Sequence, residues 1–432
     1  MSDTRRILGH EIKWLPKILR ASSDSMSQIL STSNVIAESS FKMRTIHNQI
    51  FLPHFILESG TTLYNVIIAY STYGLLNAKR DNVIVVCHGF SASTQVTHWW
   101  KGMVGANRAL DPSKYFIICL NALGSPFGSA SPLTSINEQL SLGPYGPNFP
   151  LATIRDDVRI HNEVLNILGI QHILCVVGGS MGGMTALEWA YLGSQKVRSF
   201  VSIAATARLG AWAISWNEVQ RHCIISDPAY RNGQYSPLAP PVSGLMGARM
   251  AALLTYRSRD SYENRFGRDL AMGYRASPLS PATPESGSIS MDSGSSEENF
   301  EDSPQPFLTQ TYIRYNAGKF CTTFDANCYI ALTHKLDTHD VTRGRVSSTS
   351  QTPVADALSQ LTQPGLVVGI SSDMLYPLQE QKDMASGLRN AEYRVIVSDN
   401  GHDGFLLHTE ELNSILEDFL YSVNKQVTVL EP

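Results

Sequence analysis

The chain alternates short, almost unbroken apolar runs with longer stretches whose apolar residues recur every three or four positions. Short apolar runs without a polar face are typical of strands that are buried on both sides, and the three- and four-residue spacing is typical of amphipathic helices. Together they predict an α/β fold, a mainly parallel sheet with helices on both faces. We expect strands at 83–87, 115–120, 173–177, 197–203, 366–370 and 393–397, and helices at 154–168, 183–192 and 410–423.

The segment HFILESGTTLYNVIIAY at 54–70 precedes this pattern. It contains two extended stretches around a Ser-Gly turn, which predicts a β-hairpin at the edge of the sheet.

The strand pattern stops between about residues 206 and 345. Helical stretches such as 247–256 and 312–336 dominate there, and the strands resume near Pro364. We therefore expect a helical cap at 206–345, inserted between two parts of the core at 46–205 and 346–432. Within the cap, the Ser-, Pro- and acid-rich segment 276–306 is too polar to bury a core of its own, which predicts a flexible loop.

The first 45 residues form an N-terminal extension that combines basic and apolar residues with a Ser-rich stretch. A mitochondrial transit peptide has this composition, although Asp3, Glu11 and Asp24 weigh against one. The alternative is a loosely attached extension of a cytoplasmic protein.

Composition excludes several functional classes. The formal net charge of −4 provides no overall attraction to nucleic acid, and no apolar run approaches the roughly 18 residues that a membrane span needs. The six cysteines are scattered without a CxxC pair, which indicates reduced, mostly buried thiols rather than a disulfide framework or a zinc site. P-loop and dinucleotide-binding fingerprints are absent from the sequence.

The strongest local signal is the segment HILCVVGGSMGGMTALEWA at 172–190. It contains the one G-x-S-x-G motif of the chain, centred on Ser180, between an apolar run and an amphipathic helix. That context is typical of a nucleophile elbow, a tight strand-to-helix turn that requires small neighbours and exposes the serine hydroxyl. We therefore predict Ser180 as a nucleophile.

A nucleophile elbow is followed along the chain by an acid and then a histidine. Asp373 comes just after one predicted strand and His402 lies in a Gly-flanked loop after the next, with Asp399 as the alternative acid. We predict that His402 acts as general base and then acid, and that Asp373 orients it.

Two backbone amides are expected to form the oxyanion hole. One belongs to Met181, directly after the nucleophile, and the other to Phe90 in the loop that follows an earlier strand. We assign the neighbouring His88 a structural hydrogen-bonding role.

Several longer motifs resemble the homoserine O-acetyltransferases of the α/β-hydrolase fold, particularly the fungal members, and the related deacetylcephalosporin C acetyltransferases. The resemblance runs from about residue 51 to the C-terminus, interrupted at the Ser/Pro-rich loop. The motifs that carry it are TYGLLNAKRDN, DPSKYFIICLNALGSPFGSASP, FPLATIRDDVR, GGSMGGMTALEWA, FDANCYIALTHKLDTHD, SSDMLYP and GHDGF.

The resemblance implies an acetyl-CoA-dependent acyltransferase of methionine biosynthesis with a ping-pong mechanism. Ser180 would take acetyl from acetyl-CoA and pass it to an amino-acid hydroxyl, without a metal or another cofactor. By the family pattern Arg249 would hold the acceptor carboxylate, Tyr256 would line the pocket and Asp403 would bind the ammonium group. A homodimer formed through the cap is also implied.

Three positions depart from the family pattern. The oxyanion loop reads His88-Gly89-Phe90 where Ala-Leu is usual after the histidine. Ser131 precedes Pro132 where Gly is common, and Gly404 replaces the frequent Ala after His-Asp. All three positions are expected near the site, so these departures leave two further acceptors open, L-serine and a secondary-metabolite alcohol such as deacetylcephalosporin C. A serine hydrolase, in which water resolves the acyl-enzyme, is the other alternative, because the fold and the triad are common to both classes.

Overall fold

The computed structural model describes residues 30–34, 47–137, 142–271 and 305–430. A nine-stranded sheet runs through its centre in the order β1-β2-β3-β5-β4-β8-β9-β10-β11, and the pairs from β5 to β11 are parallel. The strands are β1 Leu30–Asn34, β2 His47–Ile56, β3 Thr62–Tyr73, β4 Val83–Cys87, β5 Phe116–Leu120, β8 Cys175–Gly179, β9 Phe200–Ile203, β10 Gly365–Ile370 and β11 Ala391–Ile396. A separate small ribbon pairs β6 Ser135–Asn137 with β7 Leu142–Pro144.

The predicted α/β architecture is confirmed, as are the hairpin and all six predicted strand regions. Every residue of β4, β8, β9 and β10 is buried, which explains their continuous apolar sequences. The antiparallel strand β1 was not predicted, and it lies within the segment that the sequence assigned to the N-terminal extension.

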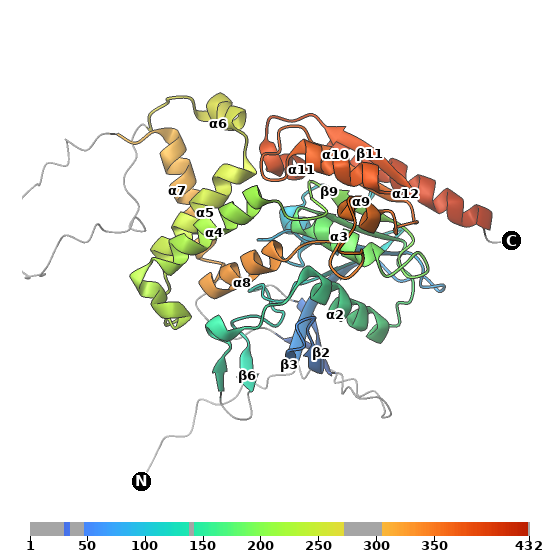
Figure 1. Cartoon of the computed structure of the whole chain (residues 1–432), viewed down its shortest axis with the longest axis horizontal. Helices are drawn as coiled ribbons and strands as arrows, with labels where there is room; N and C mark the ends of the chain where they lie inside the picture. The colour runs from blue at the N-terminus through green and yellow to red at the C-terminus, as the bar shows by residue number, and fades with distance from the viewer. Residues whose placement is uncertain (1–29, 35–46, 138–141, 272–304, 431–432) are drawn as a thin grey trace, which may run out of the picture.

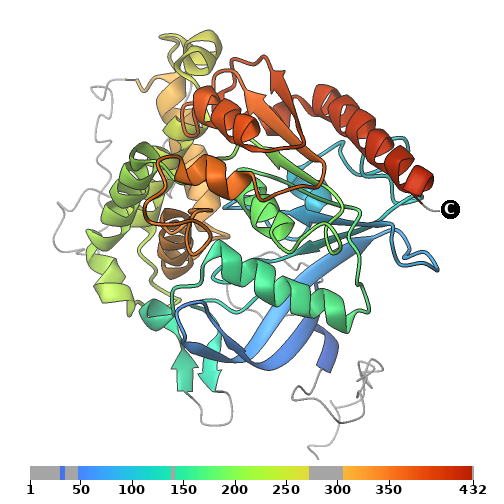
Figure 2. The same ribbon diagram turned by 45° about the vertical axis from the view of Figure 1, so that its right-hand side comes forward.

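Helices cover both faces of the sheet (Figures 1 and 2). One face carries α2 Ile154–Ile167, α3 Met181–Ala190, the short α9 Pro353–Leu358 and α10 Leu378–Gly387. The other face carries α1 Val96–Trp99 and the C-terminal α12 Thr409–Leu430. The N-terminus of α2 is set by a capping box, in which Thr153 and Asp156 each accept a hydrogen bond from the other's backbone amide.

Five helices pack together beside the sheet (Figure 1). They are α4 Ala211–Ile225, α5 Val242–Tyr256, α6 Arg259–Phe266, α7 Leu308–Cys321 and α8 Ala326–Asp337. They lie within the predicted cap, whose exact bounds stay a prediction. Most of the predicted flexible loop 276–306 lies outside the described residues, but its two flanks meet where the Ala271 amide donates to the Pro306 carbonyl at 2.9 Å.

The sequence predicted one helical stretch at 312–336, and this was wrong because the chain turns between α7 and α8. Asp325 is the reason: its carboxylate accepts a hydrogen bond from the Cys328 amide at 2.9 Å and so begins a new helix.

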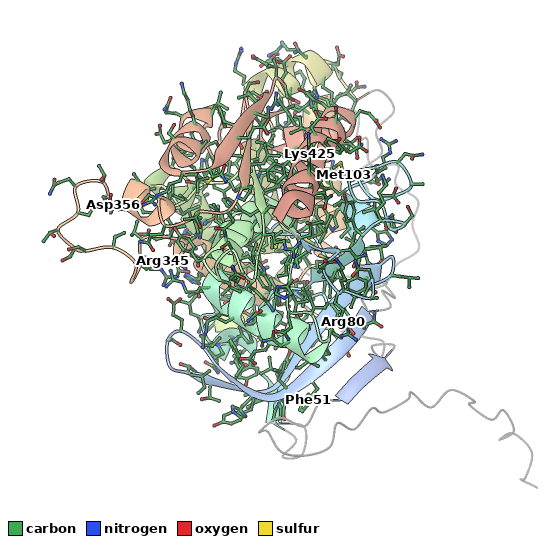
Figure 3. The ribbon with its side chains drawn as sticks, turned by 90° about the vertical axis from the view of Figure 1, so that its right-hand side faces the viewer. Phe51, Arg80, Met103, Arg345, Asp356 and Lys425 are labelled. Atoms are coloured by element: carbon green, nitrogen blue, oxygen red, sulfur yellow. The ribbon has the colours of Figure 1, made fainter. Side chains whose placement is uncertain are left out.

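A charge network joins the end of the cap region to the core. Arg345 donates to both carboxylate oxygens of Glu188 on α3, at 3.0 and 2.5 Å, and its guanidinium lies 3.5 Å from the centroid of the Tyr191 ring. Arg155 on α2 bridges Glu188 and Glu58 of the edge hairpin. In Figure 3, Arg345 lies where the segment that continues to Asp356 projects from the body of the molecule.

A second junction between cap and core is a buried ion pair. The Lys335 ammonium of α8 contacts the Asp157 carboxylate of α2 and donates to the Leu123 carbonyl at 2.8 Å. The other Asp157 oxygen accepts the Leu123 amide at 2.8 Å, and both charged side chains are almost completely buried. The pair therefore ties the cap, α2 and the loop after β5 together.

Replacing Lys335 with methionine should lower the apparent free energy of unfolding by about 3–5 kcal/mol, because Asp157 is left buried without a counter-charge. Adding Asp157→Leu should recover part of that loss. Urea unfolding followed by fluorescence measures both changes, with Lys382→Met, at an exposed position of α10, as the control. Equal unfolding midpoints for Lys335→Met and the control would contradict the assigned role of the pair.

Candidate active site

The tight turn between β8 and α3 places Ser180 at the carboxyl end of the sheet. Ser180 has φ 60° and ψ −127°, a strained backbone conformation for a residue with a side chain. A Cβ atom at Gly182 would lie 2.0 Å from the Cys87 carbonyl oxygen, and one at Gly178 would lie 2.4 Å from the Gly182 backbone. The two glycines of the motif are therefore required by close backbone contacts, and the predicted nucleophile elbow is present.

The structure brings Ser180, His402 and Asp373 together. His402 Nε2 lies 2.8 Å from Ser180 Oγ, and His402 Nδ1 lies 2.7 Å from Asp373 Oδ2. Asp373 follows β10, and His402 lies in the short 3-10 helix η4, Gly401–Asp403, that follows β11. The alternative acid Asp399 does not take this place; its backbone carbonyl accepts a hydrogen bond from Ser258.

Four donors surround the Asp373 carboxylate. Oδ1 accepts the backbone amides of Leu375 at 2.9 Å and Tyr376 at 3.0 Å. Oδ2 accepts His402 Nδ1 and the side-chain amide of Gln381, the latter at 3.3 Å. The sequence did not single out Gln381, because a glutamine on an amphipathic helix carries no signal of its own.

Burial lowers the pKa of His402, but the charge of Asp373, its hydrogen bond and the charge of Asp403 together raise that pKa above the ordinary value of 6.5. A carboxylate can only accept hydrogen bonds, so Nδ1 carries the proton and Nε2 is free to accept the Ser180 hydroxyl proton. This arrangement can activate Ser180 for attack on an acyl group.

The loop after β4 lies against the elbow, as the predicted oxyanion hole requires. Met181 opens α3, and the first amides of a helix have no acceptor within it. Within the described residues, the Phe90 amide has no hydrogen-bond acceptor either. The Phe90 ring packs 4.9 Å from Tyr329 of the cap, measured between centroids.

The structural role predicted for His88 is confirmed. Its Nε2 accepts the Ala122 amide at 3.0 Å and its Nδ1 contacts the Gly89 carbonyl at 2.9 Å. Burial lowers the pKa of His88 to about 4, so the ring stays neutral and joins the oxyanion loop to the loop after β5.

Arg249 and Tyr256 of α5 lie on the cap side of the site. The Tyr256 ring centroid is 6.1 Å from that of His402, and the Arg249 guanidinium is 5.3 Å from the Tyr256 ring and 4.5 Å from the Phe320 ring. Arg249 Nε and Nη1 are buried and have no hydrogen-bond partner in the described part of the chain. The cap thus presents a guanidinium with unused donors beside the triad.

Asp403 adjoins His402 but is already paired. Its Oδ2 lies 2.9 Å from Nε of Arg257, the residue that follows Tyr256. Burial raises the pKa of Asp403, although the charges of Arg257, His402 and Arg249 act in the opposite direction. Arg257 was not predicted from the sequence, where its only signal is its place next to the candidate pocket residue Tyr256.

The other two departures from the family pattern are Ser131 and Gly404. Ser131 was expected near the site, but its hydroxyl interacts with Leu133 and with Cys328 of α8 rather than with the triad. Gly404 follows Asp403 and packs closely on β10, since a Cβ there would lie 2.7 Å from Ile370. Within the described residues, no group of three or more His, Cys, Asp and Glu side chains is arranged to hold a metal, and no helix is long and apolar enough to cross a membrane.

Comparison with known proteins agrees with this geometry. Residues 82–409 match the family model described as the alpha/beta hydrolase fold. A homoserine O-acetyltransferase of Gibberella fujikuroi is 49% identical over 376 residues, which cover 86% of this chain and 87% of the relative. One of Emericella nidulans is 45% identical over 421 residues, covering 87% and 86%.

The chain belongs to the homoserine O-acetyltransferase family. Among solved structures, the homoserine O-acetyltransferase of Bacillus anthracis superposes with a TM-score of 0.72 at 24% identity, covering 87% of this chain and 97% of that one. At that identity the likeness shows the common fold. Family membership and the assembled Ser-His-Asp arrangement make this chain an acyltransferase.

The raised pKa of His402 gives a prediction for the pH dependence of acylation. His402 must be neutral to accept the serine proton, so the rate of p-nitrophenyl acetate cleavage should fall on acidification with a midpoint above 6.5. Asp403→Asn should move that midpoint to lower pH, because it removes one negative charge that favours protonated His402. Asp356→Asn, at an exposed position of α9, is the control; an unchanged midpoint in Asp403→Asn would contradict the electrostatic account.

Proposed function

We propose that this protein transfers acetyl from acetyl-CoA to the side-chain hydroxyl of L-homoserine through an acetyl-Ser180 intermediate. His402 takes the Ser180 proton while Oγ attacks the thioester carbonyl, and the amides of Phe90 and Met181 receive the developing oxyanion. The tetrahedral adduct then collapses: its C–S bond breaks, CoA leaves with the proton from His402, and acetyl-Ser180 remains. Homoserine then repeats the sequence in reverse: its hydroxyl loses a proton to His402, attacks the acetyl carbon and releases Ser180.

The observation that carries this proposal is the guanidinium of Arg249, whose buried Nε and Nη1 have no hydrogen-bond partner in the described part of the chain. Buried donors without an acceptor are costly, and the planar donors of a guanidinium match a carboxylate. Water has neither the negative charge nor the paired oxygens that match a guanidinium, whereas an amino-acid acceptor has both in its carboxylate. Transfer is therefore favoured over hydrolysis, and we assign the acceptor carboxylate to Arg249 with Tyr256 beside it.

The acceptor ammonium group is assigned to Asp403. Arg257 already contacts Oδ2, so the ammonium would approach the remaining oxygen, Oδ1. With Arg249 and Asp403 at its two charged ends, the acceptor presents its hydroxyl to His402, and the hydroxyl displaces Ser180 from the acetyl group. Acetyl-CoA acts as co-substrate, and no metal or prosthetic group takes part in this mechanism.

Release of free CoA from acetyl-CoA is the direct assay of this function. With purified protein, L-homoserine should stimulate release strongly, L-serine weakly, and omission of an acceptor should leave only slow release. Ser180→Ala should abolish all three rates. Preference for L-serine or deacetylcephalosporin C would keep the mechanism and change the acceptor, and equal release without an acceptor would establish a hydrolase.

Arg249→Met should raise the KM for L-homoserine by about 100-fold, because it removes one partner of a desolvated charge pair. The first-turnover release of CoA should be unchanged, since acetyl-CoA does not need the carboxylate site. Arg314→Gln, at an exposed position of α7 in the same cap, is the control. Unchanged KM in Arg249→Met would contradict the assignment of the acceptor carboxylate.

We further propose a cytoplasmic homodimer. Helix α4 leaves Trp212, Val219 and Ile225 about half exposed, which suits a second copy packed on the cap. Sedimentation of the purified protein tests the dimer.

A mitochondrial targeting segment is the alternative interpretation of the N-terminal extension. Because β1 pairs with β2, a segment that is removed would have to end before Leu30.

A further inference from the structure

His88 contacts two backbone groups that belong to different loops at the edge of the site. Its Nε2 lies 3.0 Å from the Ala122 amide nitrogen, in the loop after β5, and its Nδ1 lies 2.9 Å from the Gly89 carbonyl oxygen. The second of these contacts falls on the peptide unit that carries the Phe90 amide.

The partners of the His88 ring decide where its proton lies. A backbone amide can only donate, so Nε2 accepts from Ala122 and carries no proton. Burial lowers the pKa of His88 to about 4, so the ring is neutral at neutral pH and its one proton lies on Nδ1. Nδ1 therefore donates to the Gly89 carbonyl.

The peptide unit between Gly89 and Phe90 is planar, and in its trans form the carbonyl and the N–H point in opposite directions. Donors on the Gly89 carbonyl oxygen therefore also fix the direction of the Phe90 N–H. His88 Nδ1 is one such donor, and the Ala92 amide is another at 3.1 Å. The Phe90 amide itself has no acceptor in the described part of the chain, so it is available to a substrate oxygen.

Contacts with the elbow fix the place of this loop but not the direction of that peptide. A Cβ atom at Gly182 would lie 3.1 Å from the His88 carbonyl oxygen, and one at Gly89 would lie 3.7 Å from the Gly179 carbonyl oxygen. Glycine is freer about its backbone bonds than other residues, so Gly89 by itself would let the peptide turn over. The hydrogen bonds to the Gly89 carbonyl oppose this rotation, and His88 supplies the one from a side chain.

The loop that holds Nε2 is itself anchored to α2. The Leu123 amide donates to Asp157 at 2.8 Å, and His161 Nε2 lies 3.1 Å from the Asn121 carbonyl oxygen. Both neighbours of Ala122 are thus tied to one helix. The Ala122 amide therefore holds the His88 ring from a fixed place and keeps Nδ1 aimed at the Gly89 carbonyl.

We propose that His88 is a positioning residue for the oxyanion hole: its Nδ1 proton holds the Gly89–Phe90 peptide so that the Phe90 amide faces the developing oxyanion. This inference rests on the proposed role of Phe90. The His88 ring keeps its proton throughout the cycle. Because both half-reactions pass through a tetrahedral adduct, His88 assists acylation and deacylation alike.

Asparagine and glutamine separate the two contacts of His88. The side chain of His88→Asn can place a donor near the position of Nδ1, and that of His88→Gln can place an acceptor near the position of Nε2. His88→Gln should slow both the first-turnover release of CoA and the discharge of the acetyl-enzyme by about 10- to 100-fold, less than the roughly 100- to 1,000-fold loss when an oxyanion donor is removed outright. His88→Asn keeps the donor to Gly89 and should stay within about fivefold in both steps.

Two further readings separate positioning from loss of structure. The amplitude of the CoA burst counts intact sites, and it should not change while the rate falls. The homoserine concentration for half-maximal discharge should also stay the same, because Arg249 and Asp403 hold the acceptor. His339→Gln is the matched control, since His339 is equally buried and its Nε2 lies 3.0 Å from the Thr206 carbonyl oxygen.

Three results would overturn the assignment: slowing in His88→Asn that equals or exceeds that in His88→Gln, a lower burst amplitude in place of a lower rate, or unchanged rates in His88→Gln. Absence of a CoA burst in the unsubstituted protein would instead refute the proposed acetyl transfer. Cleavage of p-nitrophenyl acetate needs the oxyanion hole but not acetyl-CoA, so the same two variants would still decide the role of His88.

Discussion

The close approach of the α3 start to the end of β4 is the constraint on which the site depends. Only a residue without a side chain can occupy position 182, because the Cys87 carbonyl oxygen takes the place of a Cβ. This contact brings the amide of Met181 next to the loop that carries Phe90 and turns Ser180 outward in its strained conformation. The free energy that offsets this strain comes from the packing of the fully buried strand β8, which leads into the turn, and of its neighbour β4.

The cap depends on the same region. Its aromatic residues Phe324 and Tyr329 pack against Phe90, and its Lys335 reaches the loop after β5 through Asp157 and Leu123. The oxyanion loop and the cap are thus parts of one packed unit rather than separate layers. A cap attached in this way holds Arg249 at a defined place relative to His402, as an acyltransferase requires if an amino acid is to compete with water.

Much of the fold was predictable because its signals are local. Buried parallel strands have unbroken apolar sequences, and the elbow, acid and histidine follow one another in a known order at strand ends. Features that depend on contacts distant in sequence were not predictable. Asp157 and Lys335 are 178 residues apart, and nothing in either segment indicates the other. The pairing of Arg257 with Asp403 likewise arises only when the loop after β11 meets the cap.

The central claim is that Ser180 carries the acetyl group between two substrates. The most direct measurement is the intact mass of the protein after brief mixing with acetyl-CoA alone, followed by addition of L-homoserine. We predict a gain of one acetyl group, located on Ser180 by peptide mapping, that disappears with homoserine much faster than in buffer and is absent from Ser180→Ala. Full activity without any acetylated Ser180, or discharge no faster with homoserine than with water, would contradict the account.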